Sequence, residues 1–570
     1  MALAGLAFLV GAIVGSGHGG SAGQRLSEQF ASAWSRGDYA NMYEDIDPAE
    51  RGRISAADFQ DAYRQAARTA TESALTVTGR ARGEDGVFVV PMRVQTRLWG
   101  TLRENLRLRV AGAPQGARVE WSHALLFPGL GAGESLRRNM SMPARAALLA
   151  RDGTVLAEGP ASGAGTRESP LGTAAAAVVG EVGPIPKERL DELEAQGVPS
   201  QAIVGTSGLE LALDDRLRGR PGGELLAGDR VLASTEAKAS PPVRTTISPS
   251  LQRVAGEALG GRLGGVVALD PANGEILAVA GIGIDDLQPP GSTFKMVTLS
   301  AALEAKVASQ KSVFQYATYA TLDGVKLENA NGESCGGSLA LAFAVSCNSV
   351  FAPLGVKVGA VRLVKTAEGF GFNHPPGVDG AVESTLPAPS EIQGELDVGS
   401  TAIGQGEVQA SALEMATVAG TIADGGRRPQ PSFEAHRSPT PRPRAISAAT
   451  ARTVRRLMIG VVREGTGTSA AIPGVVVAGK TGTAELGAPS CSSGGENSSE
   501  AGSSGEESEA GKGEESCAGS KDPQNTDAWF AAFAPALHPK IAVGVLLVKD
   551  GAGGETAAPV ARQVIEAGLR

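Results

Sequence analysis

A serine and a lysine stand three positions apart in the segment PPGSTFKM, residues 289–296. The prolines and the glycine favour a turn, and the sequence that follows has good helix propensity. We therefore expect Ser292 at the start of a helix and Lys295 about one turn later on the same face. A lysine placed in this way can remove the serine proton and make Ser292 a nucleophile. A helix cap beside a solvated lysine is the simpler alternative for this segment taken alone.

Two further motifs follow in a meaningful order. Ser346 and Asn348 form an S-x-N motif, and residues 480–483 read Lys-Thr-Gly-Thr. The order S-x-x-K, S-x-N and K-T-G resembles the signature of penicillin-binding proteins and class A β-lactamases. Each motif alone is common, but three in this order are a rare accident, so the chain is expected to carry an acyl-transfer site.

The residue types suit acyl transfer through a serine. Burial and a neighbouring cation lower the pKa of a lysine, so Lys295 can serve as the base if Lys480 is close to it. Ser346 can relay the proton towards the leaving amine. Asn348 can hold the substrate amide and the lysine.

The K-T-G-T segment is expected to bind the substrate. The backbone N–H groups of Ser292 and Thr483 would form an oxyanion hole, worth about 3 kcal/mol per donor. Lys480 and Thr481 would hold the terminal carboxylate of the substrate. Gly482 would let the strand backbone approach the substrate closely.

A large domain, residues 241–570, is expected to position these motifs. A hairpin over residues 264–281 carries a turn at residues 271–274. Later segments predict a helix at residues 449–463 and three strands that pair antiparallel beside the hairpin; the strands are expected at residues 475–486, 527–535 and 540–548. Residues 264–281, 403–426 and 526–535 resemble segments that occur in the same order in penicillin-binding transpeptidases. The resemblance implies an antiparallel sheet flanked by helices, the serine β-lactamase/transpeptidase-like fold.

Two smaller regions precede that domain, so the chain is a multidomain α+β protein. Residues 24–138 have helical periodicity first and strand alternation afterwards, and the region is similar to the cone-shaped nuclear-transport-factor-2-like extension of class B penicillin-binding proteins. Residues 139–240 look like the dimerisation or linker domain of that class. They include a short hairpin around Asp152-Gly153 and a charged helix at residues 186–197.

The first 23 residues are interpreted as a membrane anchor and its linker. Residues 2–15 form an unbroken apolar run, which as a helix covers only about 21 Å of a roughly 30 Å hydrocarbon core. A Gly/Ser linker follows, which does not suit a buried core helix. We therefore expect a single-pass signal-anchor, with the bulk of the chain outside the cytoplasm.

Composition argues against several other classes of function. The net charge is −9 and no dense basic stretch occurs, so nucleic acid is an unsuitable partner. The five histidines are scattered singly, and none pairs with a cysteine at metal-ligand spacing. We expect no metal and no cofactor.

The four cysteines suggest two disulfides in an exported chain. A bridge between Cys335 and Cys347 would hold the S-x-N motif against the preceding loop. Cys491 and Cys517 flank a Ser/Gly/Glu-rich tract inside an acidic insertion at residues 487–525. Such a composition predicts a disordered loop, and a Cys491–Cys517 bridge would close it at its base. Unpaired cysteines are the alternative at both places.

The resemblance implies a monofunctional D,D-transpeptidase that cross-links peptidoglycan stem peptides. Its expected partners are those peptides, β-lactam antibiotics and a membrane glycosyltransferase of the cell-wall machinery. A second reading makes water the acceptor, as in a β-lactamase or D,D-carboxypeptidase. A third is a β-lactam sensor or scaffold whose site only binds.

Overall fold

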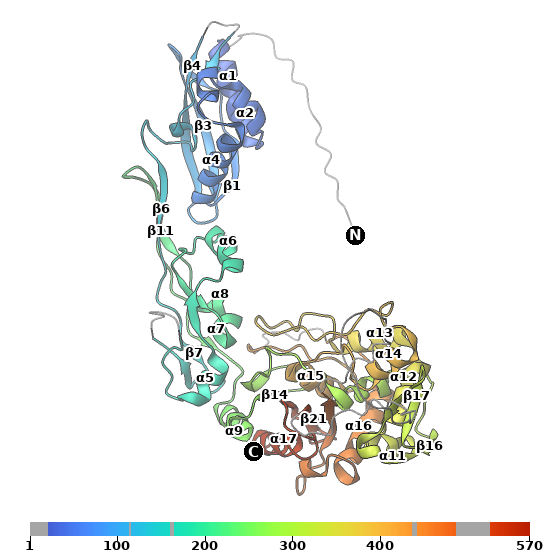
Figure 1. Cartoon of the computed structure of the whole chain (residues 1–570). Coiled ribbons are helices and arrows are strands. Elements are labelled where there is room, and N and C mark those ends of the chain that lie inside the picture. The colour runs from blue at the N-terminus through green and yellow to red at the C-terminus, as the bar shows by residue number, and fades with distance from the viewer. Residues whose placement is uncertain (1–20, 113–115, 160–164, 436–441, 486–524) are drawn as a thin grey trace, which may run out of the picture. The chain divides into compact units, whose positions relative to one another are not determined.

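The computed structural model describes residues 21–112, 116–159, 165–435, 442–485 and 525–570 (Figure 1). The chain divides into two compact units, each assembled from separate segments. The first comprises Met1–Ala144, Ile185–Ala202 and Arg218–Ser240, and the second comprises Arg145–Pro184, Ile203–Leu217 and Pro241–Arg570. The expected anchor and the acidic tract with Cys491 and Cys517 lie outside the described residues.

The first unit begins with four helices, which a five-stranded sheet follows. Their starts follow from the sequence, because a serine or aspartate side chain accepts a hydrogen bond from the first turn of each helix. The helices are α1 (Ala22–Ser35), α2 (Tyr39–Asp45), α3 (Pro48–Arg51) and α4 (Ala56–Thr69). The sheet order is β1-β3-β4-β5, with β2 pairing β3; the strands are β1 (Glu72–Val77), β2 (Arg82–Glu84), β3 (Val87–Thr96), β4 (Gly100–Ala111) and β5 (Arg118–Val119).

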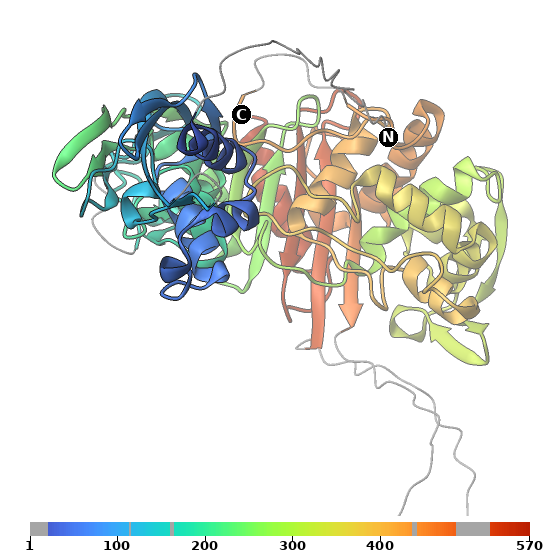
Figure 2. The ribbon, with the colours of Figure 1, turned by 90° about the horizontal axis from the view of Figure 1, so that it is seen from above.

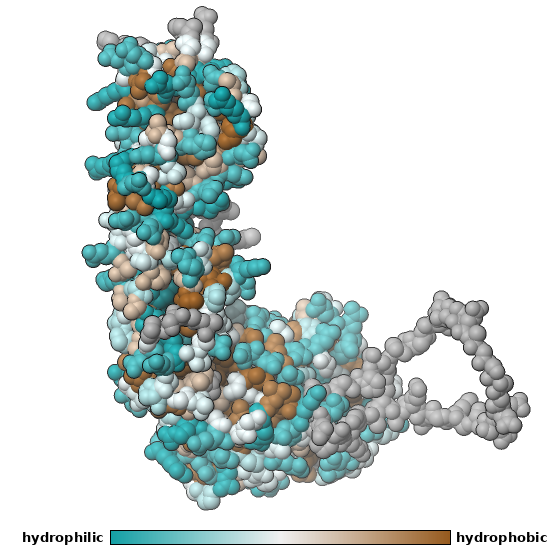
Figure 3. All heavy atoms as spheres, turned by 60° about the vertical axis from the view of Figure 1, so that its left-hand side comes forward, coloured by the Kyte–Doolittle hydropathy of each residue, from teal (hydrophilic) through white to brown (hydrophobic). Residues whose placement is uncertain are grey.

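Strand alternation separates the two faces of this sheet. Val90, Met92 and Val94 of β3 are buried in a core that also contains the tyrosine, tryptophan and phenylalanine side chains of the helices. The opposite face carries exposed arginines on β4, at Arg103 and Arg107. Many hydrophilic side chains are visible on the surface drawn in Figure 3. The helix-then-sheet order expected for residues 24–138 is thus observed.

The rest of the first unit is a three-stranded sheet and one helix. The strand order is β12-β11-β6, with β6 (Leu136–Ser141), β11 (Gly222–Ala227) and β12 (Arg230–Thr235). Leu225 and Ala227 of β11 join the core under the first four helices. The expected charged helix is α6 (Lys187–Ala195).

The second unit starts with a small linker region built around a buried ionic network. Arg145 donates to the carboxylates of Glu210 and Asp214 at 2.6 and 2.8 Å, and Arg167 donates to Glu210 at 2.8 Å. These paired charges join the segments around the expected short hairpin, β7 (Leu148–Leu149) with β8 (Val155–Ala157), to α7 (Gly208–Ala212) and α8 (Asp214–Leu217).

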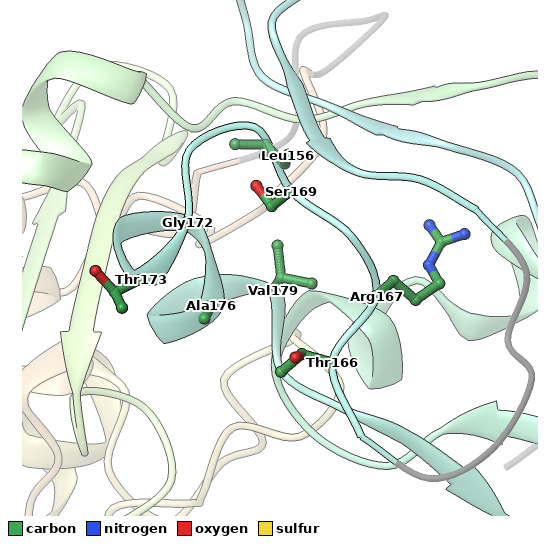
Figure 4. A pocket seen from close by; sticks show the side chains of 8 residues that line it. All are labelled: Leu156, Thr166, Arg167, Ser169, Gly172, Thr173, Ala176 and Val179. Atoms are coloured by element: carbon green, nitrogen blue, oxygen red, sulfur yellow. The ribbon is translucent and has the colours of Figure 1, made fainter.

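A hollow of about 340 Å³ lies beside this network, against α5 (Thr173–Val179). Leu156 and Val179 belong to its lining, and the guanidinium of Arg167 points away from them (Figure 4). None of the predicted site residues lines this hollow.

The large domain contains a five-stranded antiparallel sheet in the order β15-β14-β22-β21-β20. The strands are β14 (Gly264–Leu269), β15 (Ile276–Gly281), β20 (Ala478–Glu485), β21 (Thr526–Ala534) and β22 (Ile541–Leu547). Thus the expected hairpin exists, and the three later strands pair antiparallel beside it. α9 (Pro249–Leu259) and α17 (Ala557–Gly568) cover one face, while α15 (Ala412–Ala423) and α16 (Ala448–Glu464) pack on the other.

A helical region lies to one side of that sheet, at the right in Figure 2. It contains α10 (Lys295–Glu304), α11 (Leu339–Ala344), α12 (Asn348–Val358), α13 (Ala360–Phe370) and α14 (Gly394–Ala402). Two small two-stranded sheets complete it, pairing β16 (Val313–Ala317) with β19 (Cys335–Ser338) and β17 (Tyr319–Leu322) with β18 (Val325–Glu328). Within the described ranges, no helix combines the length and the apolar character that crossing a bilayer requires.

Candidate active site

Ser292 lies in a single 3₁₀ turn, η2 (Gly291–Phe294), and α10 begins only at Lys295. Our expectation of a helix start is therefore right in outline, but the serine precedes the α-helix proper. Gly291 has a φ of +50°, and a Cβ there would lie 2.7 Å from the carbonyl oxygen of Thr483. Only glycine fits both conditions, which lets the serine turn pack directly on β20.

Lys295 is the centre of the polar contacts. Its Nζ lies 3.0 Å from the Ser292 hydroxyl oxygen and donates to the Ser346 carbonyl oxygen at 2.7 Å and to Asn348 Oδ1 at 2.6 Å. The side chain is fully buried. Burial first, and the charge of Lys480 second, hold the pKa of Lys295 well below its ordinary value.

Ser346 and Asn348 come from the short connection between α11 and α12. Ser346 adopts a φ of +61°, a strained conformation for a serine, and this turn brings its side chain between two lysines. Asn348 begins α12, and its amide group donates to the Glu328 carbonyl oxygen at 2.8 Å. Both ends of the Asn348 amide are therefore fixed.

A disulfide joins Cys335 of β19 to Cys347, the residue between Ser346 and Asn348. The expected bridge is confirmed. The bond ties the S-x-N connection to β19, the strand that precedes α11. The two cysteines are 12 positions apart in the chain. The position of this connection therefore depends on a covalent link.

Lys480 extends from β20 towards the same serine. Its Nζ donates to the Ser346 hydroxyl oxygen at 2.9 Å and to the Thr481 carbonyl oxygen at 2.9 Å. This side chain is also fully buried, and burial lowers its pKa to about 7. The pair can thus hold one charge and one neutral amine near neutral pH.

The rest of the K-T-G-T segment lies in the edge strand β20. A Cβ at Gly482 would lie 2.7 Å from the Pro290 carbonyl oxygen, so this glycine permits contact between the strand and the serine turn. The Thr483 hydroxyl accepts a hydrogen bond from the Gly553 N–H at 3.5 Å. The structure thus brings the three motifs together around one point.

Sequence reasoning missed Thr466, whose hydroxyl oxygen lies 2.5 Å from that of Thr481. It belongs to a short connection after α16 and lies outside the three catalytic motifs. Only the packing of α16 against β20 brings it to the site.

Among the described residues, no cluster of three or more His, Cys, Asp or Glu side chains is placed to hold a metal ion.

Comparison with known families agrees with this geometry. The family described as the penicillin-binding protein transpeptidase domain matches residues 264–566, more than half of the chain. The chain belongs to this family. The NTF2-like N-terminal transpeptidase domain matches residues 22–134, and the penicillin-binding protein dimerisation domain matches residues 161–242.

Curated relatives and solved structures have related names. The chain is 33% identical to the peptidoglycan D,D-transpeptidase PbpA of Mycobacterium tuberculosis over 58% of this chain and 72% of that protein. It is 32% identical to PbpA of Mycolicibacterium smegmatis over 64% of this chain and 80% of that protein. The penicillin G acyl-enzyme complex of penicillin-binding protein A from M. tuberculosis aligns with a TM-score of 0.55 and 28% identity, covering 75% of this chain and 100% of that one.

Proposed function

We propose that this chain is a penicillin-binding D,D-transpeptidase that cross-links peptidoglycan stem peptides through an acyl-Ser292 intermediate. The observation that carries the proposal is the position of Lys295, whose Nζ lies 3.0 Å from the Ser292 hydroxyl oxygen inside a buried polar cluster. Family membership and the names of the relatives support the substrate class.

The hydrogen bonds of Lys295 suit a general base. A neutral amine has two N–H groups and one lone pair. The carbonyl oxygens of Ser346 and Asn348 accept the two N–H groups. The lone pair is then left for the Ser292 proton, and the lowered pKa favours the neutral amine.

Acylation follows from this arrangement. The Ser292 oxygen attacks the carbonyl carbon of the D-Ala-D-Ala peptide bond as its proton passes to Lys295. The backbone N–H groups of Ser292 and Thr483 stabilise the oxyanion. The C–N bond then breaks, and the proton reaches the leaving amine through Ser346, which lies between the two lysines.

Substrate recognition is assigned to β20. Lys480 and Thr481 hold the terminal carboxylate, and the backbone beside Gly482 lies along the peptide. An amine of a neighbouring stem peptide then attacks the acyl carbon and releases Ser292. β-Lactams enter the same pathway, because their amide carbonyl acylates the serine without releasing a small leaving group.

The domain boundaries and the location of the chain belong to the same proposal. Residues 1–23 anchor the chain in the membrane, residues 24–138 and 139–240 support the site, and residues 241–570 carry it on the outer side of the membrane. The apolar character of residues 2–15 supports the anchor. A membrane glycosyltransferase that makes the glycan strands is the expected partner.

Incubation of the full chain with penicillin G tests the proposal. Mass spectrometry is expected to find one adduct on Ser292 that persists for many minutes, and Ser292→Ala is expected to form none. Lys295→Ala should acylate at least a hundredfold more slowly, on the scale of losing a general base. Rapid turnover of penicillin would favour a β-lactamase, and labelling at another serine would refute the assignment.

A second assay separates a transpeptidase from the two remaining alternatives. Stem peptides with a D-Ala-D-Ala end are incubated with an excess of an acceptor amine. A transpeptidase forms the cross-linked amide, whereas a D,D-carboxypeptidase releases only the shortened peptide. A sensor or scaffold would form the penicillin adduct but neither peptide product.

A further inference from the structure

Thr466 contacts the S-x-N connection and the K-T-G strand at the same time. Its backbone N–H donates to the Ala344 carbonyl oxygen at 3.1 Å, two residues before Ser346. Its hydroxyl oxygen lies 2.5 Å from the Thr481 hydroxyl oxygen. Thr466 therefore links these two segments from the α16 side.

The backbone of Thr466 is fixed from two directions. A Cβ at the preceding residue, Gly465, would lie 2.3 Å from the Ala344 carbonyl oxygen. A Cβ at Gly554 would lie 2.2 Å from the Thr466 carbonyl oxygen. A side chain at either glycine would clash with a backbone carbonyl. Glycine at both positions therefore allows the neighbouring backbone segments to pack closely around Thr466.

The hydrogen positions of the two threonine hydroxyls follow from their acceptors. A hydroxyl group has one hydrogen to donate, so only one of the pair can donate to the other. The Ala344 carbonyl oxygen already receives the Thr466 N–H, and the Thr466 hydroxyl is 3.4 Å from it, at the outer limit of a hydrogen bond. The Thr466 hydroxyl is better placed to donate its hydrogen to the Thr481 hydroxyl oxygen, which lies 2.5 Å away.

We propose that Thr466 is a positioning residue that donates its hydroxyl hydrogen to Thr481, so that the Thr481 hydroxyl donates to the substrate carboxylate. The reverse order would direct a lone pair of Thr481 at the carboxylate and repel it. This inference rests on the proposed function, in which Lys480 and Thr481 hold that carboxylate.

The charge state of Lys480 gives this orientation added weight. The pKa of Lys480 is lowered to about 7, so its positive charge is partly lost at neutral pH. A neutral donor on Thr481 does not depend on pH in this range. Its correct orientation therefore matters most when the lysine is uncharged.

Two substitutions at Thr466 test the proposal in the full chain. Thr466→Val has the same shape without the hydroxyl, and Thr466→Ser keeps the hydroxyl. We expect the second-order rate constant of acylation by penicillin G to fall about tenfold in Thr466→Val, as for one hydrogen bond to a charged group, and to stay within about twofold in Thr466→Ser. Acylation by penicillin G methyl ester, which lacks the carboxylate charge, should be the same in both variants and in the wild type.

A double substitution separates positioning from a merely structural role. If Thr466 acts through Thr481, then Thr466→Val should have no further effect in a Thr481→Val background. Multiplicative losses, or equal losses with penicillin G and its methyl ester, would refute the proposal. The comparison of two substrates on one protein sample stays valid even if Thr466→Val lowers stability.

The outcomes also distinguish this inference from the proposed function. If wild-type protein forms no adduct with penicillin G, the proposed function fails. If the wild type is acylated and Thr466→Val is acylated at the wild-type rate, only the role of Thr466 is wrong.

Discussion

The amine nitrogen of Lys480 lies 2.9 Å from the hydroxyl oxygen of Ser346. Lys295 lies 3.3 Å from the same oxygen, and both lysine side chains are fully buried. Two positive charges so close together in a buried site are costly, so the two amines cannot both stay protonated near neutral pH. Burial and the charge of Lys480 both lower the pKa of Lys295, whereas the pKa of Lys480 is lowered by burial, so the charge is expected on Lys480, as the proposed acylation requires.

This division predicts a bell-shaped pH dependence for acylation by penicillin G. The rate should rise with pH as Lys295 loses its proton, because only the neutral amine can act as a base. It should fall above about pH 7, because Lys480 then loses the charge that holds the carboxylate. The second-order rate constant measured from pH 5 to 9 reports these groups in the free enzyme.

Lys480→Arg provides the control for the alkaline limb. A guanidinium keeps its charge over the whole range, so the fall above pH 7 should disappear, although the altered shape is expected to lower the rate throughout. An unchanged alkaline limb in this variant would show that another group causes it.

The Cys335–Cys347 bridge is expected to stabilise the chain and the site together. By the loop-closure relation, replacing both cysteines with alanine should reduce the free energy of unfolding by about 3 kcal/mol. Acylation should also slow, because Cys347 lies between Ser346 and Asn348. Denaturant titration and acylation rates measure the two effects.

A reducing agent supplies the matched comparison for the bridge. In a background that also carries Cys491→Ser and Cys517→Ser, reduction of the protein that keeps Cys335 and Cys347 should reproduce both losses, and the alanine double variant should not respond to reduction. Equal stability of the oxidised and reduced wild type would contradict the expected contribution of the disulfide.

Glu414 in α15 predicts a pH-dependent stability. The side chain is buried, its Oε1 has no hydrogen-bond partner, and burial raises its pKa to about 8. A raised folded-state pKa gives a stabilising contribution that is complete below the unfolded value of 4.5 and is lost as the pH rises to about 8. The loss should be on the order of 5 kcal/mol for the full shift of the pKa from 4.5 to about 8.

Glu414→Gln removes this titration while keeping the size of the side chain. The variant and the wild type should unfold at similar temperatures at pH 5, and the variant should be the more stable at pH 8. Equal differences at both pH values would mean that Glu414 does not titrate in this range.

The three motifs were predictable from the sequence because their order identifies residues that must meet. The local geometry of these motifs was harder to predict from the sequence. The positive φ of Ser346 depends on the disulfide and the helices on either side, and no residue pattern marks it. The packing of α16 brings Thr466 to the site, and the packing of α15 buries Glu414. A single sequence does not reveal either arrangement.

The final prediction concerns the acidic insertion between β20 and β21. The two strands pair at eight consecutive positions, from Ala478 with Phe533 to Glu485 with Thr526. Since Glu485 and Thr526 are direct partners, a short connection can join them, and the pairing itself holds β20 in register. Deleting residues 492–516 should therefore leave acylation by penicillin G within about twofold of the wild-type rate, on the scale of additivity between independent sites.

The cysteines that flank the deletion provide a second measurement. Cys491→Ser in the full-length chain is expected to lower the thermal unfolding temperature, because the hypothesised Cys491–Cys517 bridge would close the insertion at its base. The same substitution should leave the Ser292 adduct intact. If the deletion abolishes acylation although the protein still unfolds cooperatively, the insertion contributes to the site, and its interpretation as a separate loop is wrong.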